Sequence, residues 1–87
     1  MSVERSERIK RLLDARFRPS VLEVRDQSHL HAGHEGAKDG RGHFDVRIVA
    51  DDFRDLSRIE CHRLVYDALD DMMKTDIHAL RITAAAD

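Results

Sequence analysis

Apolar residues recur at helical spacing in two segments of the chain. Between residues 3 and 17 an apolar stripe ending at Phe17 alternates with arginine and glutamate, and Pro19 prevents any continuation. The second stripe lies between Leu56 and Lys74 and consists of Cys61, Leu64, Val65, Ala68, Leu69, Met72 and Met73. Charged residues occupy the other side of this segment. The pattern therefore predicts two amphipathic helices, each with one buried face.

The start and the end of the second helix carry their own signals. Ser57 stands where an N-cap is needed, and Glu60 follows three residues later, which is the S-x-x-E capping box. The apolar stripe breaks at Thr75 and Asp76. We therefore expect one helix that begins after Ser57 and runs to Lys74.

Three further segments show the alternation of half-buried strands, residues 21–26, 43–50 and 77–83. The last four residues, 84–87, carry no pattern. The predicted order is helix, strand, strand, helix, strand, in a single domain that spans residues 1–87. This order indicates an α+β fold with both helices packed on one face of a three-stranded mixed sheet.

The connection between the last two strands predicts which ends of these strands lie side by side. A strand–helix–strand unit with parallel strands closes by a right-handed crossover, so the third strand should run in the direction of the second. Their first residues then lie side by side. We therefore expect His78, at the start of the third strand, to lie next to the loop that precedes the second strand.

This loop, residues 27–42, has the sequence QSHLHAGHEGAKDGRG and no apolar periodicity. It is longer than an ordinary hairpin connection, and long ordered loops in compact domains are often functional. A solvated excursion without function is the alternative.

Composition limits the classes of function. At 87 residues the chain is too small for a cleft of enzyme size, and its net charge of −2 gives no bulk attraction to nucleic acid or anionic membranes. The single cysteine lies in an apolar stripe, which indicates a buried thiol and a reducing compartment. No apolar run is long enough to span a membrane, and the first ten residues lack the apolar core of a secretory signal. We expect a cytoplasmic protein.

Six histidines are unusual for this length, and four of them lie between residues 29 and 43. His31 and His34, joined by His78 from the third strand, form a plausible ligand set for a transition metal. Two or three imidazoles leave a tetrahedral site open for a substrate or for ligands from a partner molecule. The alternative is that these are polar loop side chains.

Catalytic motifs are otherwise missing from the sequence, which has no phosphate-binding glycine loop and no serine elbow. Hydrolysis at a zinc ion held by the loop histidines would need a general base, and none is evident. We therefore expect a protein that is not an enzyme.

A helix-turn-helix is another possible reading of the second helix. Arg54, Arg58 and Arg63 could contact phosphates of DNA. However, five acidic residues lie among them, which weakens this interpretation: Asp51, Asp52, Asp55, Glu60 and Asp67.

Four blocks of the chain together resemble the BolA family. They are LEVRDQSHLHAGH, HFDVRIVADDF, HRLVYDAL and IHALRI, and they extend the resemblance from about Arg8 to Thr83. Four blocks in register are specific, whereas HRLVY alone would be weak. The resemblance implies a KH-like αββαβ fold, which agrees with the order of elements predicted above.

The resemblance also implies a partner and a shared cofactor. BolA-like proteins are partners of monothiol glutaredoxins, in a heterodimer bridged by a [2Fe-2S] cluster to which the glutaredoxin cysteine and glutathione supply thiolates. The ligand from the carboxy-terminal HAL block would be His78. In the histidine-type branch the second would be His34, closely flanked by glycines, or His31. The isolated chain is expected to hold no cluster.

The alternative function within this family is that of a small DNA-binding transcriptional regulator. Cys61 stands where a basic residue is usual, which reduces the charge available to DNA. Asp55 stands where glycine is common. The pair Met72 and Met73 replaces acidic residues, so we expect an altered surface at the end of the helix.

Overall fold

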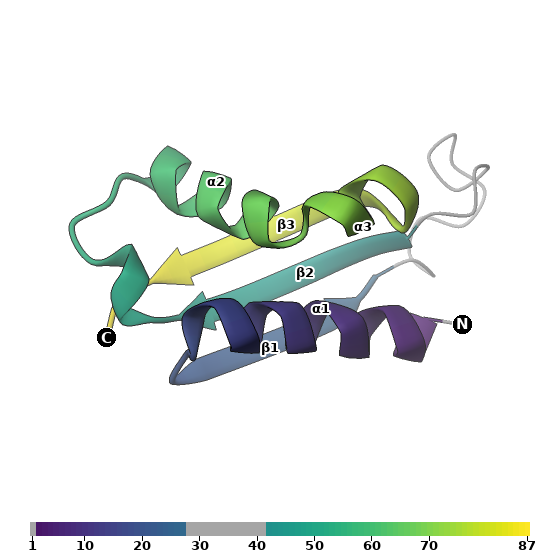
Figure 1. Ribbon diagram of the computed structural model, residues 1–87, viewed down its shortest axis with the longest axis horizontal. Coiled ribbons are helices and arrows are strands. Elements are labelled where there is room, and N and C mark those ends of the chain that lie inside the picture. Colours follow the sequence, from purple (N-terminus) through teal and green to yellow (C-terminus); the bar gives the residue numbers. More distant parts are fainter. Residues whose placement is uncertain (1, 28–41) are drawn as a thin grey trace.

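The structure, a computed structural model, describes residues 2–27 and 42–87 (Figure 1). Its elements are α1 (Ser2–Phe17), β1 (Val21–Asp26), β2 (Gly42–Val49), the 3-10 helix η3 (Asp51–Phe53), α2 (Arg58–Ala68), α3 (Asp70–Thr75) and β3 (Ile77–Ala85). The predicted order of helices and strands is confirmed, with one helix divided in two.

The three strands form one mixed sheet in the order β1-β2-β3. β1 pairs antiparallel with β2, from Val21 opposite Val49 to Asp26 opposite Phe44. β2 pairs parallel with β3, as the crossover rule predicts. All helices lie on one side of this sheet, so the predicted α+β architecture is confirmed (Figure 1).

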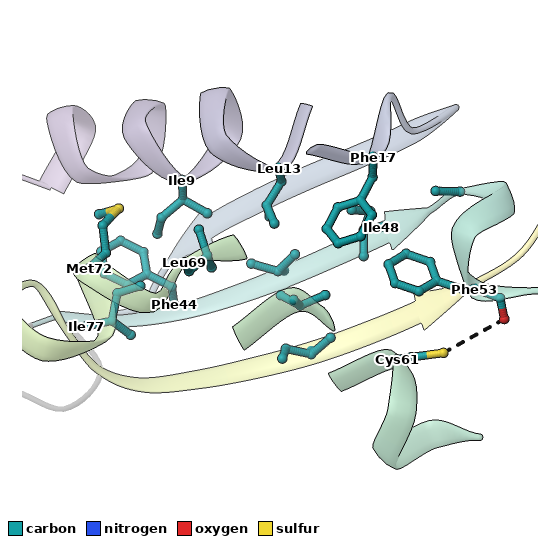
Figure 2. Close-up of a cluster of buried hydrophobic side chains, with 14 residues drawn as sticks. Ile9, Leu13, Phe17, Phe44, Ile48, Phe53, Cys61, Leu69, Met72 and Ile77 are labelled. Atoms are coloured by element: carbon teal, nitrogen blue, oxygen red, sulfur yellow. Dashed lines mark hydrogen bonds between the residues drawn. The ribbon is translucent and has the colours of Figure 1, made fainter. Parts of the chain in front are cut away.

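The core lies between the helices and the covered face of the sheet (Figure 2). α1 contributes Ile9, Leu13 and Phe17, all nearly inaccessible to solvent, and the Phe17 ring packs 5.1 Å from that of Phe53. The remaining buried apolar residues are Phe44, Val46, Ile48, Ala50, Cys61, Val65, Leu69, Met72, Ile77 and Ile82. The alternation of residues 43–50 predicted a half-buried strand, and every second residue of it, from Phe44 to Ala50, is buried.

The predicted single helix from Ser57 to Lys74 is wrong in one respect, because it breaks at Leu69. The Leu69 amide donates to the carbonyls of both Val65 and Tyr66, and α3 starts at the next residue. Asp70 and Asp71 then occupy the first turn of α3. Their carboxylates are stabilising there because the N-terminus of a helix carries a partial positive charge. Met72 is buried and Met73 is partly buried against the core, so the expectation of an altered surface formed by these two methionines is wrong.

The third strand is longer than the sequence predicted. β3 continues to Ala85, and the Ala50 amide donates to the Ala85 carbonyl at 3.0 Å. The residues after the predicted end are mostly small alanines, which carry little alternation, but their backbone groups still pair with β2. The chain end is also held, because Asp87 accepts hydrogen bonds from the Ser20 hydroxyl and the Arg54 guanidinium.

No helix in residues 2–27 and 42–87 is long and apolar enough to cross a lipid bilayer.

Candidate functional site

The site begins at an irregularity in the pairing of β2 with β3. Gly42 lies opposite Ile77, but the next residue of β2, His43, lies opposite Ala79. One extra residue of β3, His78, is therefore accommodated in a bulge. Bulges often redirect a side chain at the edge of a sheet. Here the bulged residue is a histidine whose side chain is exposed.

The bulge brings two histidines together. The imidazole rings of His43 and His78 have centroids 5.2 Å apart and an angle of 50° between their planes. His43 is half-buried on the central strand, whereas His78 is exposed on the edge strand. The pair therefore combines a ring held by its surroundings with a ring that another molecule can reach.

The backbone just before His78 is fixed from several directions. The Gly42 amide donates to the Asp76 carbonyl at 2.9 Å, and the Asp76 amide donates to Met72 at 2.7 Å. The Asp76 side chain accepts from Arg5 of α1 at 3.3 Å and from Arg8 at 3.4 Å. Asp76 thus joins α1, α3 and β2 two residues before the exposed histidine.

Asp76 is held in its ionised form. Its pKa lies below its ordinary value, chiefly because the Thr75 hydroxyl donates to the carboxylate. Partial burial opposes this effect, and the charges of Arg8 and Arg5 reinforce it. The start of β3 is therefore fixed by a charged cluster rather than by the backbone pairing alone.

The predicted loop ligands, His31 and His34, lie outside the described residues. The segment that carries them leaves the sheet after Gln27 and returns at Gly42. The Gln27 amide donates to the His43 carbonyl at 2.8 Å and the Gly42 amide donates to the Asp76 carbonyl, so both ends of the segment lie at the end of the sheet where β3 begins. The expected meeting of the third strand with the ends of this loop is confirmed.

His43 is missing from the ligand set that the sequence predicts. It belongs to the clustered histidines, but the alternation of residues 43–50 assigns it to the start of a strand. The signal was present, because the predicted parallel pairing already set the first residue of the second strand beside the first residue of the third. The bulge that completes the juxtaposition has no sequence signal.

The chemistry of this edge is that of nitrogen donors. Imidazole replaces cysteine as an iron ligand in some [2Fe-2S] centres, so exposed histidine at this edge is a donor that such a cluster accepts. Within residues 2–27 and 42–87, no group of three or more histidine, cysteine or acidic side chains could hold a metal ion. The pair of described imidazoles would therefore need donors from elsewhere to complete a site.

Other residues singled out from the sequence lie away from this edge. Cys61 is buried as predicted, with its sulfur 3.9 Å from the Phe53 carbonyl oxygen (Figure 2). His62 is half-buried in the middle of α2. Arg54 forms an ion pair with Asp51 at 2.9 Å, which satisfies one of the cations considered for phosphate contacts.

Comparisons with known proteins agree on one family. The family model described as BolA-like protein matches residues 13–87. SufE-like protein 1 of Arabidopsis thaliana, described as chloroplastic/mitochondrial, is 44% identical over 85 residues, which cover 92% of this chain. The chain spans only 23% of the length of that relative. The similarity therefore concerns one domain of a larger protein.

A solved structure and a bacterial relative extend this comparison. The structure of the BolA domain of SufE1 from Arabidopsis thaliana has a TM-score of 0.83 and 43% identity, covering 94% of this chain and 91% of that one. The protein of Escherichia coli named DNA-binding transcriptional regulator BolA is 37% identical over 76 residues. The match covers 87% of this chain and 70% of the bacterial protein.

Proposed function

Because the chain belongs to the BolA-like family, we propose that it is a non-enzymatic adaptor in iron–sulfur cluster handling. It shares a [2Fe-2S] cluster with a monothiol glutaredoxin and glutathione. The observation that carries this proposal is the exposed His78 at a β-bulge, where both ends of a histidine-rich segment also lie. The similarity to a domain of a SufE-like protein supports a role connected with iron–sulfur clusters.

In this proposal His78 is the ligand from β3. The second ligand is His34 or His31, as the family resemblance implies, with His43 as a further candidate because its ring lies 5.2 Å from that of His78. The partner's cysteine and the glutathione thiolate complete the other side of the cluster. Histidine ligation raises the reduction potential of such a cluster, which suits sensing or transfer better than electron transport.

The experiment mixes the protein with a cluster-loaded monothiol glutaredoxin and glutathione. We expect changes in the visible absorption and circular dichroism of the cluster, because imidazole replaces a ligand of the original centre. The changes should disappear in His78→Ala. The variants His31→Ala, His34→Ala and His43→Ala then identify the second ligand by loss of the same signal.

His62→Ala is the matched control, because His62 is a half-buried histidine on α2, outside the proposed site. This variant should give the spectrum of the unaltered chain. If the unaltered chain causes no spectral change at any ratio to the glutaredoxin, the proposal is wrong. An unchanged response in His78→Ala would exclude His78 as a ligand.

A second candidate function is DNA-binding regulation. The observation in its favour is the name of the relative from Escherichia coli, together with a similarly named protein of Haemophilus influenzae that is 30% identical over 74 residues. DNA binding would weaken steeply with salt, with a slope set by the number of phosphates contacted. A titration of duplex DNA at low ionic strength that shows no binding would eliminate this candidate.

A further inference from the structure

The face of the sheet that the helices leave uncovered carries a regular arrangement of charges. Alternate residues of each strand point to this face, because their neighbours Val24, Val46 and Ile82 pack toward the core. The pairing sets Arg25, Asp45 and Arg81 in one row across the three strands. Glu23, Arg47 and Thr83 form the next row. We call these two rows the open face.

The open face is more basic than the rest of the chain. Arg58, at the start of α2, lines the same depression as both rows, so four arginines meet two carboxylates there. The whole chain has a net charge of −2. Arg47 and Glu23 form an ion pair at 3.8 Å. Among the described residues, Arg25, Arg58 and Arg81 form no ion pair.

The open face also continues into the histidine site. Its depression has a volume of about 500 Å³, and a second depression of about 480 Å³ adjoins it. Asp45 and Arg81 line both, and the second is also lined by Gln27, His43 and Ala79. A molecule bound at His78 and His43 would therefore also contact the adjacent row of Arg25, Asp45 and Arg81.

We propose that the open face is the docking surface for the protein that supplies the cluster thiolates, and that this partner presents an acidic patch beside its cluster-binding cysteine. The inference rests on the proposed function, because it extends the contact made at His78. Its basis is that guanidinium groups outnumber carboxylates on this surface. Carboxylates of a partner could form bidentate ion pairs with the arginines that have none. Complementary charges of this kind chiefly raise the rate of association and select the partner.

Charge reversal on the open face tests the proposal. Arg81→Glu and the double variant Arg25→Glu/Arg81→Glu are titrated with the cluster-free glutaredoxin, with association rates measured at low and moderate salt. We expect affinity to fall by about tenfold for the single variant, mainly through slower association, and further for the double variant. The dependence on salt should weaken in parallel. Arg63→Glu is the matched control, because Arg63 is an exposed arginine on α2, in the helical layer.

A variant with the opposite expected sign separates docking from misfolding. Asp45 lies between Arg25 and Arg81 and offsets part of their charge. Asp45→Asn should therefore bind the partner severalfold more tightly, which a damaged fold would not produce. Thermal unfolding of each variant verifies that it is folded.

The outcomes distinguish this inference from the proposed function. Unchanged affinity in the double variant, with normal binding by the unaltered chain, overturns the docking surface but leaves the role of His78 intact. Loss of affinity for DNA with unchanged affinity for the glutaredoxin also overturns it. The docking surface is supported if the double variant loses partner affinity while His78→Ala keeps it and loses only the cluster spectrum. No binding and no spectral change with the unaltered chain would reject the proposed function itself.

Discussion

Two residues of the structure have backbone angles that most side chains avoid. Among the described residues other than glycine, only Arg18 and Asp55 have positive φ, at 47° and 63°. Arg18 follows the last residue of α1, and its amide donates to the Asp14 carbonyl at 2.9 Å, closing the helix before Pro19. Asp55 ends the turn before α2. Glycine would adopt this conformation without the steric cost that a Cβ atom brings.

Replacing Asp55 tests this explanation. We expect Asp55→Gly to stabilise the fold by about 0.5–1 kcal/mol and Asp55→Val to destabilise it by about 1–2 kcal/mol, since a β-branched residue is disfavoured in the left-handed region. Urea denaturation measures both changes. Asp52 is exposed and has no positive φ, so Asp52→Gly should destabilise the fold instead. The explanation fails if both glycine variants change stability in the same direction.

Asp76 offers a second prediction for a single residue. Its carboxylate is only 17% exposed and bonds to Arg5 and Arg8, which are 32% and 43% exposed. Asp76→Asn should therefore lower the free energy of unfolding at neutral pH by about 1 kcal/mol. Asp70→Asn is the control, because Asp70 and its partner Lys74 are both about two-thirds exposed. This control should change stability by only a few tenths of a kcal/mol at most; equal effects in the two variants would refute a special role for Asp76.

At the scale of whole elements, the sequence predicted every strand and both amphipathic segments, because these are encoded by periodicity. The capping box at Ser57 and Glu60 also formed as expected, with reciprocal bonds of 3.1 and 2.8 Å. The break at Leu69 could not be predicted, because the apolar residues between Leu56 and Lys74 have the spacing expected both for one continuous helix and for two consecutive helices. The bulge at His78 depends on the register of two strands that are separated by both helices α2 and α3, and no local pattern records it.

The capping box makes the stability of α2 dependent on pH. The pKa of Glu60 is lowered, first by the hydrogen bond that its carboxylate accepts from the Ser57 amide and next by the Ser57 hydroxyl. A lowered pKa in the folded state means that the contribution is complete above the unfolded value of about 4.5 and is lost as the pH falls through the folded value.

We therefore expect the stability difference between the unaltered chain and Glu60→Gln to shrink as the pH is lowered from 7 to about 3. Urea denaturation across this range measures it. Ser57→Ala should cost about 1 kcal/mol at neutral pH, because the hydroxyl that caps the Glu60 amide is lost. It should remove only part of the pH dependence contributed by Glu60, because the amide of residue 57 can still donate to the Glu60 carboxylate. A difference that stays constant with pH would show that the Glu60 charge has no role in the cap.

At the scale of the whole molecule, one topological rule located the candidate site. The parallel crossover placed the start of β3 beside the start of β2, which is why two histidines distant in sequence lie together. Sequence could not choose between the loop histidines and His43, because spacing along a chain does not determine distance across a sheet. The open face could not be predicted from the sequence either, because the register of all three strands determines which charged residues lie in the same row.

The division of the molecule into two faces leads to a final prediction. The core lies between the helices and the covered face of the sheet (Figures 1 and 2). His78, by contrast, is exposed near the start of the edge strand β3. Stability and cluster binding should therefore be separable. Leu13 is fully buried in α1, so Leu13→Ala should lower the free energy of unfolding by about 2–4 kcal/mol, a large share of the total for so small a domain.

Under conditions where Leu13→Ala remains folded, its spectral response to the cluster-loaded glutaredoxin should equal that of the unaltered chain. His78→Ala should show the reverse pattern, with stability changed by less than about 0.5 kcal/mol because the side chain is exposed, and the spectral response lost. Urea denaturation and visible circular dichroism on the same samples measure both quantities. A reduced response in folded Leu13→Ala would mean that the packing of α1 controls the histidine edge, and that the two faces of the sheet do not act independently.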